Sequence, residues 1–185
     1  TYQTKPTKAT IKKDSSSAVC GKCHQRGGTD IPPLAKGGFV RHHEQFNEVE
    51  VGAHQGTDCV ECHNPHKRAI NIKTECVACH EDQAFLAQAK TTHGQAGVDC
   101  VDCHMPAATK SAVKTGKFSG DVRTHIMKIN LDPNASMFKP GVLAGKKVTF
   151  TQGFVTLDFA CLSCHGSKDV ELAAKIALNY HNLTE

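Results

Sequence analysis

The chain has 185 residues, no Trp, only 5% aromatic residues and a formal charge of +4 with its histidines neutral. That length suits one domain, yet side chains so poor in aromatic groups would build only a thin hydrophobic core. No apolar run approaches the roughly 20 residues that a membrane-spanning helix needs, so we expect no transmembrane segment.

The first 19 residues precede every cysteine and are rich in Lys, Ser and Thr. We expect residues 1–19 to form an extended arm, because such a polar segment buries too little apolar surface to fold alone. No leader peptide is visible before Thr1, which suggests a mature chain whose export signal has been removed. Residues 20–185 are predicted to form a single domain.

From residue 20 onward, the motif Cys-x-x-Cys-His occurs five times and uses every cysteine of the chain. The paired cysteines are Cys20 and Cys23, Cys59 and Cys62, Cys76 and Cys79, Cys100 and Cys103, and Cys161 and Cys164. The histidines that follow them are His24, His63, His80, His104 and His165. The pattern is the attachment signature of c-type haem, because two thiols at this spacing can add to the two vinyl groups on one porphyrin edge. The next residue then lies beneath the ring, where its imidazole binds the iron. We therefore expect five haem c groups.

Three other uses of paired cysteines explain the pattern less well. Structural zinc sites combine such pairs two at a time, which an odd number of pairs fills badly. A disulfide framework leaves the following histidines unexplained. Thioredoxin-like chemistry usually needs one such pair in an α/β context, which the sequence does not show.

Seven histidines lie outside the motifs, and each of five irons would need a sixth ligand. These candidates are His42, His43, His54, His66, His93, His125 and His181. Because they outnumber the irons, we expect bis-histidine coordination at all five haems. The methionines are weaker candidates, since there are three and Met105 directly follows His104.

Two of these histidines have similar surroundings. His54 and His93 each precede a motif by a short glycine-containing loop, so each is expected to reach a neighbouring haem. His66 follows a proline that ends the preceding motif helix, and we expect it to face a different ring from His63.

Two predicted helices also carry histidines. The segment 39–49 has helical periodicity and should turn His42, His43 or both inward. Near the carboxyl end, the segment 166–181 is the strongest predicted helix, which Ser167 can cap and which His181 ends.

The fold class follows from these elements. We predict a mainly α protein with long irregular connections, packed around its haems and containing little sheet. The partial alternation between residues 146 and 159 suggests a short strand or hairpin.

The second half of the chain contains, in order, HGQAGVDCVDCHMP, GDVRTHIMKIN, ACLSCHG and a helical histidine. This order resembles multihaem cytochromes c of anaerobic respiring and metal-reducing bacteria, and is similar to the haem-binding half of pentahaem cytochrome c nitrite reductase. The resemblance implies that His93 ligates the haem of His165, that His181 ligates the haem of His104, and that His125 reaches an earlier haem. Those reductases carry a catalytic motif that ends in lysine, whereas all five motifs here end in histidine, so that activity is not expected.

Two classes of function fit this pattern. The first is an electron carrier whose bis-histidine haems have lowered potentials. It would be a periplasmic shuttle between redox partners, or a subunit that self-associates into an extracellular filament and reaches a metal or electrode acceptor. The alternative is a small oxidoreductase in which one open iron reduces nitrite or a related oxyanion. Haem c is attached outside the cytoplasmic membrane, so we expect an exported protein. Counting propionates and ferric irons, the oxidised protein would carry roughly −1, which argues against nucleic-acid binding.

Overall fold

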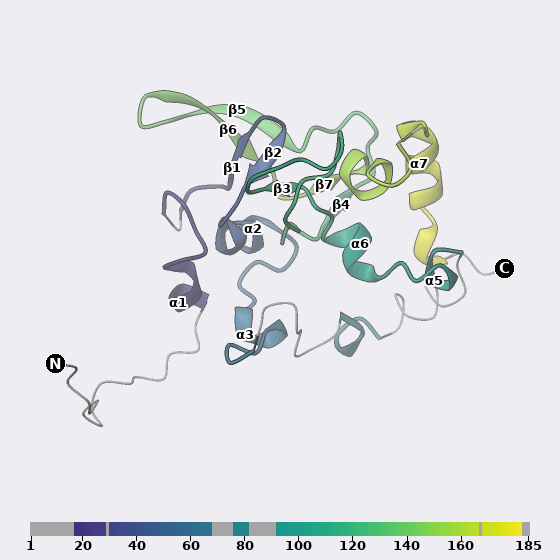
Figure 1. The fold of residues 1–185 in the computed structure, drawn as a ribbon, viewed down its shortest axis with the longest axis horizontal. Helices are drawn as coiled ribbons and strands as arrows, with labels where there is room; N and C mark the ends of the chain where they lie inside the picture. The colour runs from purple at the N-terminus through teal and green to yellow at the C-terminus, as the bar shows by residue number, and fades with distance from the viewer. Residues whose placement is uncertain (1–16, 29, 68–75, 82–91, 167, 183–185) are drawn as a thin grey trace.

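The computed structural model describes residues 17–28, 30–67, 76–81, 92–166 and 168–182 (Figure 1). The helical elements are α1 (Ser17–Gly21), α2 (Gln45–Val51), α3 (Cys59–Cys62), the 3-10 helix η1 (Cys76–Ala78), α5 (Thr92–Gln95), α6 (Cys100–His104), the π-helix η2 (Asp158–Leu162), α7 (Val170–Ala177) and the 3-10 helix η3 (Tyr180–Asn182). The strands are β1 (Leu34–Lys36), β2 (Phe39–Arg41), β3 (Thr109–Lys110), β4 (Ile129–Asn130), β5 (Phe138–Leu143), β6 (Lys146–Thr151) and β7 (Val155–Thr156).

A five-stranded mixed sheet is the largest regular feature, so the prediction of a mainly α protein with little sheet is wrong. Its strand order is β3-β2-β1-β6-β5, and only the β2–β3 pair is parallel. A second, two-stranded sheet pairs β4 with β7 in parallel. Most of these strands have only two or three residues, which is too short for an alternating pattern to stand out in the sequence.

The strand or hairpin predicted between residues 146 and 159 is present as the strand β6, but it forms no hairpin within that range, because β6 pairs with the preceding β5 while β7 pairs with β4. The turn between β5 and β6 consists of Ala144 and Gly145, with φ angles of 50° and 76°. Positive φ at both central residues is the geometry of two-residue hairpin turns that match the twist of the strands. The sequence conceals β5 because it contains Pro140 and Gly141, which an edge strand tolerates.

The helix predicted over residues 39–49 begins only at Gln45. Phe39 and Val40 belong instead to β2, where they are 3% and 0% exposed. These residues pair in the sheet and do not extend the helix, because sheet pairing buries both side chains against the core. His42 and His43 consequently lie in the bend between β2 and α2.

The hydrophobic core lies within residues 30–52 and 106–160, which we call the sheet lobe. Its buried apolar cluster consists of Phe39, Val40, Ala108, Ile126, Met137, Val155, Phe159 and Ala160. Cys161, the first cysteine of the fifth motif, packs against this cluster. The core therefore anchors one of the five motifs directly.

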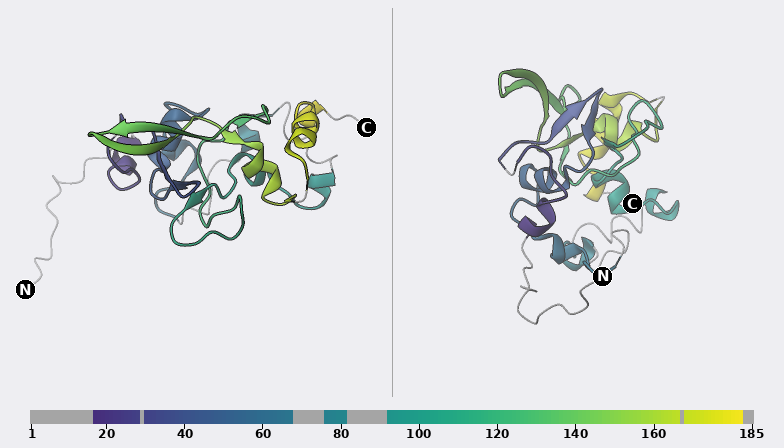
Figure 2. Two further views of the ribbon diagram at one scale, coloured as in Figure 1. Left: turned by 90° about the horizontal axis from the view of Figure 1, so that it is seen from above. Right: turned by 60° about the vertical axis from the view of Figure 1, so that its left-hand side comes forward.

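The motif edge is the second region, formed by residues 17–28, 53–67, 76–81, 92–105 and 161–166. In Figure 1 its elements α1 and α3 lie below the sheet, and the two are in contact. Figure 2 shows the β5–β6 hairpin and α7 at opposite ends of the molecule. The motif edge thus runs along one side of the sheet lobe.

At the carboxyl end, α7 is shorter than the predicted helix, and Asp169 rather than Ser167 is its N-cap. The Asp169 side chain accepts a hydrogen bond from the Glu171 backbone N–H at 3.1 Å. His181 lies beyond α7, in η3. Ser167 lies outside the described residues.

The predicted amino-terminal arm, residues 1–19, falls mostly outside the described residues, which begin at 17. Residues 17–19 form the start of α1. Within the described part of the chain, no helix is long and apolar enough to cross a membrane.

Candidate functional site

Every motif histidine faces one histidine from outside the motifs. The ring centroids are separated by 6.4 Å for His24 and His43, 6.3 Å for His63 and His125, 6.0 Å for His80 and His54, 5.9 Å for His104 and His181, and 5.6 Å for His165 and His93. An imidazole nitrogen binds a transition metal at about 2 Å, so two imidazoles on opposite sides of one metal ion place their ring centroids about 6 Å apart. Each pair therefore has the separation that a single iron between the rings requires.

His93 and His165 form the pair with the shortest distance between ring centroids. Their Nε2 atoms lie 3.4 Å apart, although the residues are separated by 72 positions in the chain. Nε2 is the atom by which an imidazole usually reaches a metal when its Nδ1 is engaged elsewhere. The two coordinating atoms thus already point toward a common centre.

Two motif histidines are oriented through their Nδ1 atoms. Nδ1 of His104 lies 2.9 Å from the backbone carbonyl oxygen of Met127, and Nδ1 of His24 lies 3.3 Å from Oε1 of Gln45. Because both partners are oxygen acceptors, each Nδ1 must donate its proton, and in a neutral imidazole Nε2 then carries none. That tautomer is the one that binds a metal through Nε2.

A buried carboxylate holds the segment that carries His125. Glu48 is 1% exposed and accepts hydrogen bonds from the His125 backbone N–H at 2.5 Å and from Oγ1 of Thr109 at 3.0 Å. One Glu48 oxygen also lies 3.7 Å from Nδ1 of His125. Outer partners of this kind fix the orientation of a metal-binding imidazole. No local pattern in the sequence marks Glu48, because its role depends on a contact across 77 positions.

Two of the facing histidines have a lowered pKa. Burial, followed by repulsion from His80 and His104, lowers the pKa of His54. Burial, followed by repulsion from His104, lowers the pKa of His181. Since neutral imidazole is the form that coordinates a metal, both shifts favour ligation.

The ten cysteines are all described, and none of them forms a disulfide. Burial, then repulsion from Cys76, raises the pKa of Cys100 to about 11. Burial, then repulsion from Cys161, raises the pKa of Cys103 to about 11. These interactions place the fourth motif beside both the third and the fifth.

The first three motifs are adjacent in the same way. Burial, then repulsion from Cys59, raises the pKa of Cys20. Burial, then repulsion from Cys76, raises the pKa of Cys62. Ser17 reinforces the first contact, because its hydroxyl accepts a hydrogen bond from the Cys59 backbone N–H at 2.9 Å. The five motifs therefore lie in a row that follows their order in the sequence.

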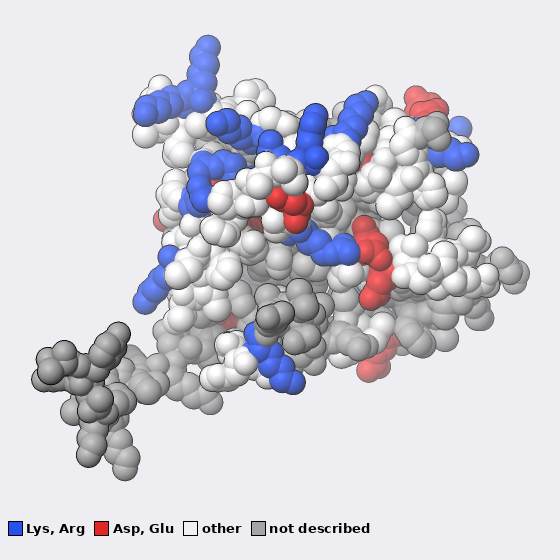
Figure 3. Space-filling view, viewed as in Figure 1, with Lys and Arg blue, Asp and Glu red and all other residues white. Residues whose placement is uncertain are grey.

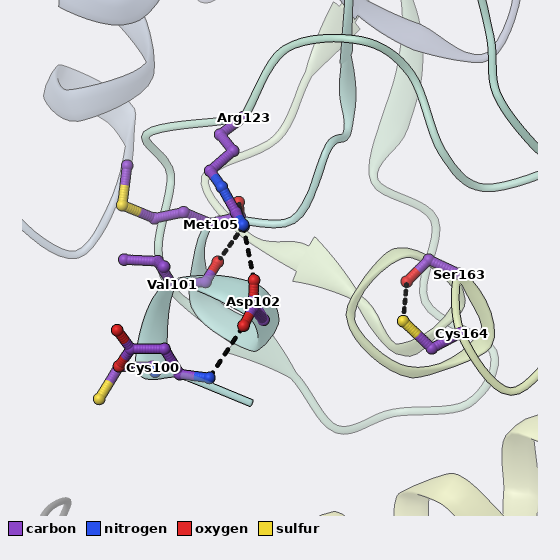
Figure 4. A network of polar contacts seen from close by, with 8 residues as sticks. Cys100, Val101, Asp102, Met105, Arg123, Ser163 and Cys164 are labelled. Carbon is purple, nitrogen blue, oxygen red and sulfur yellow. Dashed lines mark hydrogen bonds and ion pairs between the residues drawn. The ribbon is translucent and has the colours of Figure 1, made fainter. Parts of the chain in front are cut away.

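A short helix with polar contacts at both ends supports the fourth motif (Figure 4). At the start of α6, Asp99 is the N-cap and shares a capping box with Asp102. At the other end, Arg123 donates to the carbonyl oxygens of Val101 and Met105 at 2.8 and 3.1 Å, and binds the Asp102 carboxylate at 2.6 Å. Arg123 thereby supplies a donor to the Met105 carbonyl at the end of α6, and a second donor to the Val101 carbonyl, which also accepts from the Met105 backbone N–H.

Two of the seven histidines, His42 and His66, belong to none of these pairs. His42 lies 4.5 Å from His43 between ring centroids, and its Nε2 is 3.1 Å from Nη2 of Arg26. Burial, followed by repulsion from Arg26, lowers the pKa of His42. The His66 backbone N–H donates to Oδ1 of Asn64 at 3.0 Å. The expectation that His66 faces a second ring has no supporting ring contact among the described residues.

Comparisons with known proteins show a shared fold. No protein-family model and no curated protein matches the chain. Among solved structures, it is similar to form II of the octahaem sulfite reductase MccA from Wolinella succinogenes, with a TM-score of 0.54 and 24% sequence identity. The match covers 69% of this chain and 26% of that protein, so this chain spans about a quarter of its length. The fold is therefore one that also occurs within a multihaem protein.

Proposed function

We propose that this chain carries five c-type haems and transfers electrons through them. The observation that carries the proposal is the one-to-one pairing of five motif histidines with five others, at separations of 5.6 to 6.4 Å. A haem placed in each pair would receive four ligands from its macrocycle and two from the protein. Covalent attachment would use the two cysteines of each motif.

The distal ligands follow from the same pairs. The proposed assignments are His43 opposite His24, His125 opposite His63, His54 opposite His80, His181 opposite His104, and His93 opposite His165. Haem supplies reversible one-electron chemistry when bound. The protein contributes two neutral imidazoles to each iron, which lowers the reduction potential relative to methionine ligation.

The row of motifs supports an electron-transfer role. Since each motif lies beside the next one in the sequence, electrons would enter at the first motif and leave near the fifth in short steps. The protein would be exported, because haem c is attached outside the cytoplasmic membrane. It would serve as a periplasmic carrier between redox partners or as a self-associating subunit of an extracellular filament. Each motif histidine has a facing imidazole in its own chain, so a filament would not need to borrow a ligand across its interface.

A small oxyanion reductase is the second candidate. The similarity in fold to part of an octahaem sulfite reductase favours it. The complete set of imidazole pairs favours the carrier, since a reductase needs an iron with an open position for its substrate.

Ligation can be tested by carbon monoxide binding to the reduced holoprotein, together with a haem count. Six-coordinate bis-histidine haem largely excludes carbon monoxide, so we expect five haems per chain and almost no binding. Substantial binding by the unsubstituted protein would instead support the reductase. His181→Ala should open one iron per chain, whereas the matched control His66→Ala should open none.

The two carrier forms can be distinguished by electron microscopy of the native protein sheared from cells. Ordered filaments whose repeat accommodates this chain would support self-association. Discrete small particles would support a diffusing carrier.

A further inference from the structure

A groove of about 610 Å³ opens on the sheet lobe, between the β1–β2 turn and the loop that precedes Phe118. Pockets that hold small molecules usually have volumes of about 300–1,000 Å³. The groove is lined by four phenylalanines and by Lys114 and Lys117. This combination of aromatic and cationic side chains restricts the chemistry of any ligand that fits.

The phenylalanines form an aromatic cradle around Phe159. The ring of Phe159 lies 5.8 Å from Phe39, 5.9 Å from Phe118 and 6.1 Å from Phe138, with interplanar angles of 79°, 73° and 87°. Phe39 and Phe159 are buried, whereas Phe118 and Phe138 are only partly buried. The two partly buried rings therefore offer aromatic surface to the groove.

Positive charge surrounds this cradle. Nζ of Lys117 lies 4.8 Å from the Phe118 ring centroid, and Nζ of Lys110 lies 5.7 Å from the Phe39 ring centroid. The charged residues that line the groove are one acidic residue, Asp158, and two basic residues, Lys114 and Lys117. Figure 3 shows that Lys and Arg side chains gather over the sheet lobe along the upper part of this face. A negatively charged ligand is favoured at the rim.

The loop that carries these lysines is already ordered. The Asp121 carboxylate accepts hydrogen bonds from the backbone N–H groups of Ser111, Ala112 and Val113 at 2.6 to 3.1 Å. These bonds lower the pKa of Asp121 to about 2, so the carboxylate stays charged at neutral pH. Thr115 donates from Oγ1 to the Ser119 hydroxyl at 2.9 Å. A ligand would therefore spend little free energy on ordering the wall of the groove.

We infer that this groove binds a planar aromatic anion, with its ring system between Phe118 and Phe138 and its acidic group against Lys114 and Lys117. Aryl sulfonates, aryl carboxylates and anionic quinones belong to this class. The phenylalanine rings favour a planar aromatic ligand through stacking, and the lysine ammonium groups favour a ligand with negative charge.

The site also lies close to the proposed redox centres. Phe159 stands two residues before Cys161, and both belong to or pack against the same buried cluster. A ligand in the groove would lie beside the segment that leads into the fifth motif. The binding inference goes beyond the proposed function and its test does not require electron transfer.

Isothermal titration calorimetry of the oxidised holoprotein can test the inference with anthraquinone-2,6-disulfonate as the probe. Hexane-1,6-disulfonate is the matched ligand, because it has the same charge and no ring. We expect saturable one-to-one binding of the aromatic probe and at least tenfold weaker binding of the ring-free one. Equal binding of both compounds, or no binding of the aromatic one, would overturn the inference.

Paired substitutions locate the site. Lys114→Gln combined with Lys117→Gln should weaken binding of the aromatic probe about tenfold. The matched control, Lys146→Gln combined with Lys147→Gln on β6, removes the same charge outside the groove and should change binding less than about twofold. An equal loss in both variants would assign the attraction to the general basic surface and overturn the site.

A third variant makes the test independent of lysine substitution. Phe118→Leu keeps an apolar side chain and the charge but removes one stacking surface, so it should also weaken binding of the aromatic probe. Unchanged binding by Phe118→Leu would contradict the proposed position of the ring. Haem content and carbon monoxide binding, measured on the same samples, show separately whether the proposed electron-transfer site is intact.

Discussion

In the sheet lobe Ile126, Met137 and Val155 are between 0% and 2% exposed, whereas along the motif edge Gly21 is the one buried residue among those described. The sheet lobe thus has a core of buried side chains of its own. The motif edge has helices of only four or five residues, which are too short to be stable alone in water. The difference indicates that the motif edge depends on groups other than its own side chains, and five haems would supply the missing apolar surface.

Preventing haem attachment should produce the largest difference in hydrogen-exchange protection between the two regions. When the chain is produced without haem attachment, we expect the backbone amides of β6 to keep their protection from hydrogen exchange. The amides of α3 and α6 should exchange rapidly, because few buried contacts hold them. Mass spectrometry of the exchanged protein measures both. Equal protection of all three elements would show that the motif edge folds without its proposed cofactors.

The core of the sheet lobe should be sensitive to truncation. Met137→Ala removes a side chain that is 2% exposed and should lower the free energy of unfolding by about 2–5 kcal/mol. Val142→Ala is the control on the neighbouring hairpin, where the side chain is 66% exposed, and should cost less than about 0.5 kcal/mol. Chemical denaturation of both holoproteins measures the difference. Similar losses for the two variants would contradict the location of the core.

Glu48 connects the two regions, since it lies in the sheet lobe and holds the segment of His125, whose ring faces His63 of the motif edge. Glu48→Ala leaves the His125 backbone N–H and the Thr109 hydroxyl without their acceptor, which should cost about 2–4 kcal/mol of unfolding free energy. It should also perturb the absorption spectrum of one haem, because the orientation of a distal ligand changes.

The matched control is Glu50→Ala, on the same helix and only partly buried. It should change neither the stability by more than about 0.5 kcal/mol nor the haem spectrum. A loss of stability in Glu48→Ala with an unchanged spectrum would show that the carboxylate is structural and does not position the ligand.

Glu44 should produce an effect that depends on pH. Its side chain is 0% exposed, and burial raises its pKa to about 7, although the nearby Arg41 pulls the pKa down. Because the folded state holds this proton more tightly than the unfolded state, stability is greatest below about pH 4.5 and falls as the pH rises to about 7. Above pH 7 the buried charge should cost about 3 kcal/mol, because each unit of pKa shift corresponds to about 1.4 kcal/mol.

Glu44→Gln should remove this dependence of the free energy of unfolding on pH. Its free energy of unfolding should exceed that of the unsubstituted protein at pH 8 and approach it at pH 5, as measured by denaturant titration at the two pH values. Glu50→Gln provides the comparison for a matched change on α2. A constant difference between Glu44→Gln and the unsubstituted protein at both pH values would contradict the raised pKa.

Local patterns in the sequence predicted part of the structure well. A helix near the carboxyl end is present as α7, because capping and helix propensity act over a few neighbouring residues. The five-stranded sheet was not predicted, since β1 pairs with β6 through Leu34 and Phe150, which are far apart in the chain. The helical periodicity of residues 39–49 was overridden in the same way, when β2 gained partners on both sides.

The histidines show which features of the candidate site can be predicted from the sequence and which cannot. The sequence by itself determined the number of Cys-x-x-Cys-His motifs and the chemistry they favour, because attachment to a porphyrin edge depends on residues that are adjacent in the chain. Only the tertiary structure decided which of His42 and His43 faces His24, and that His125 faces His63. Those pairings depend on how the chain folds back on itself through the sheet and the buried Glu48, and such long-range contacts leave no periodic pattern in the sequence.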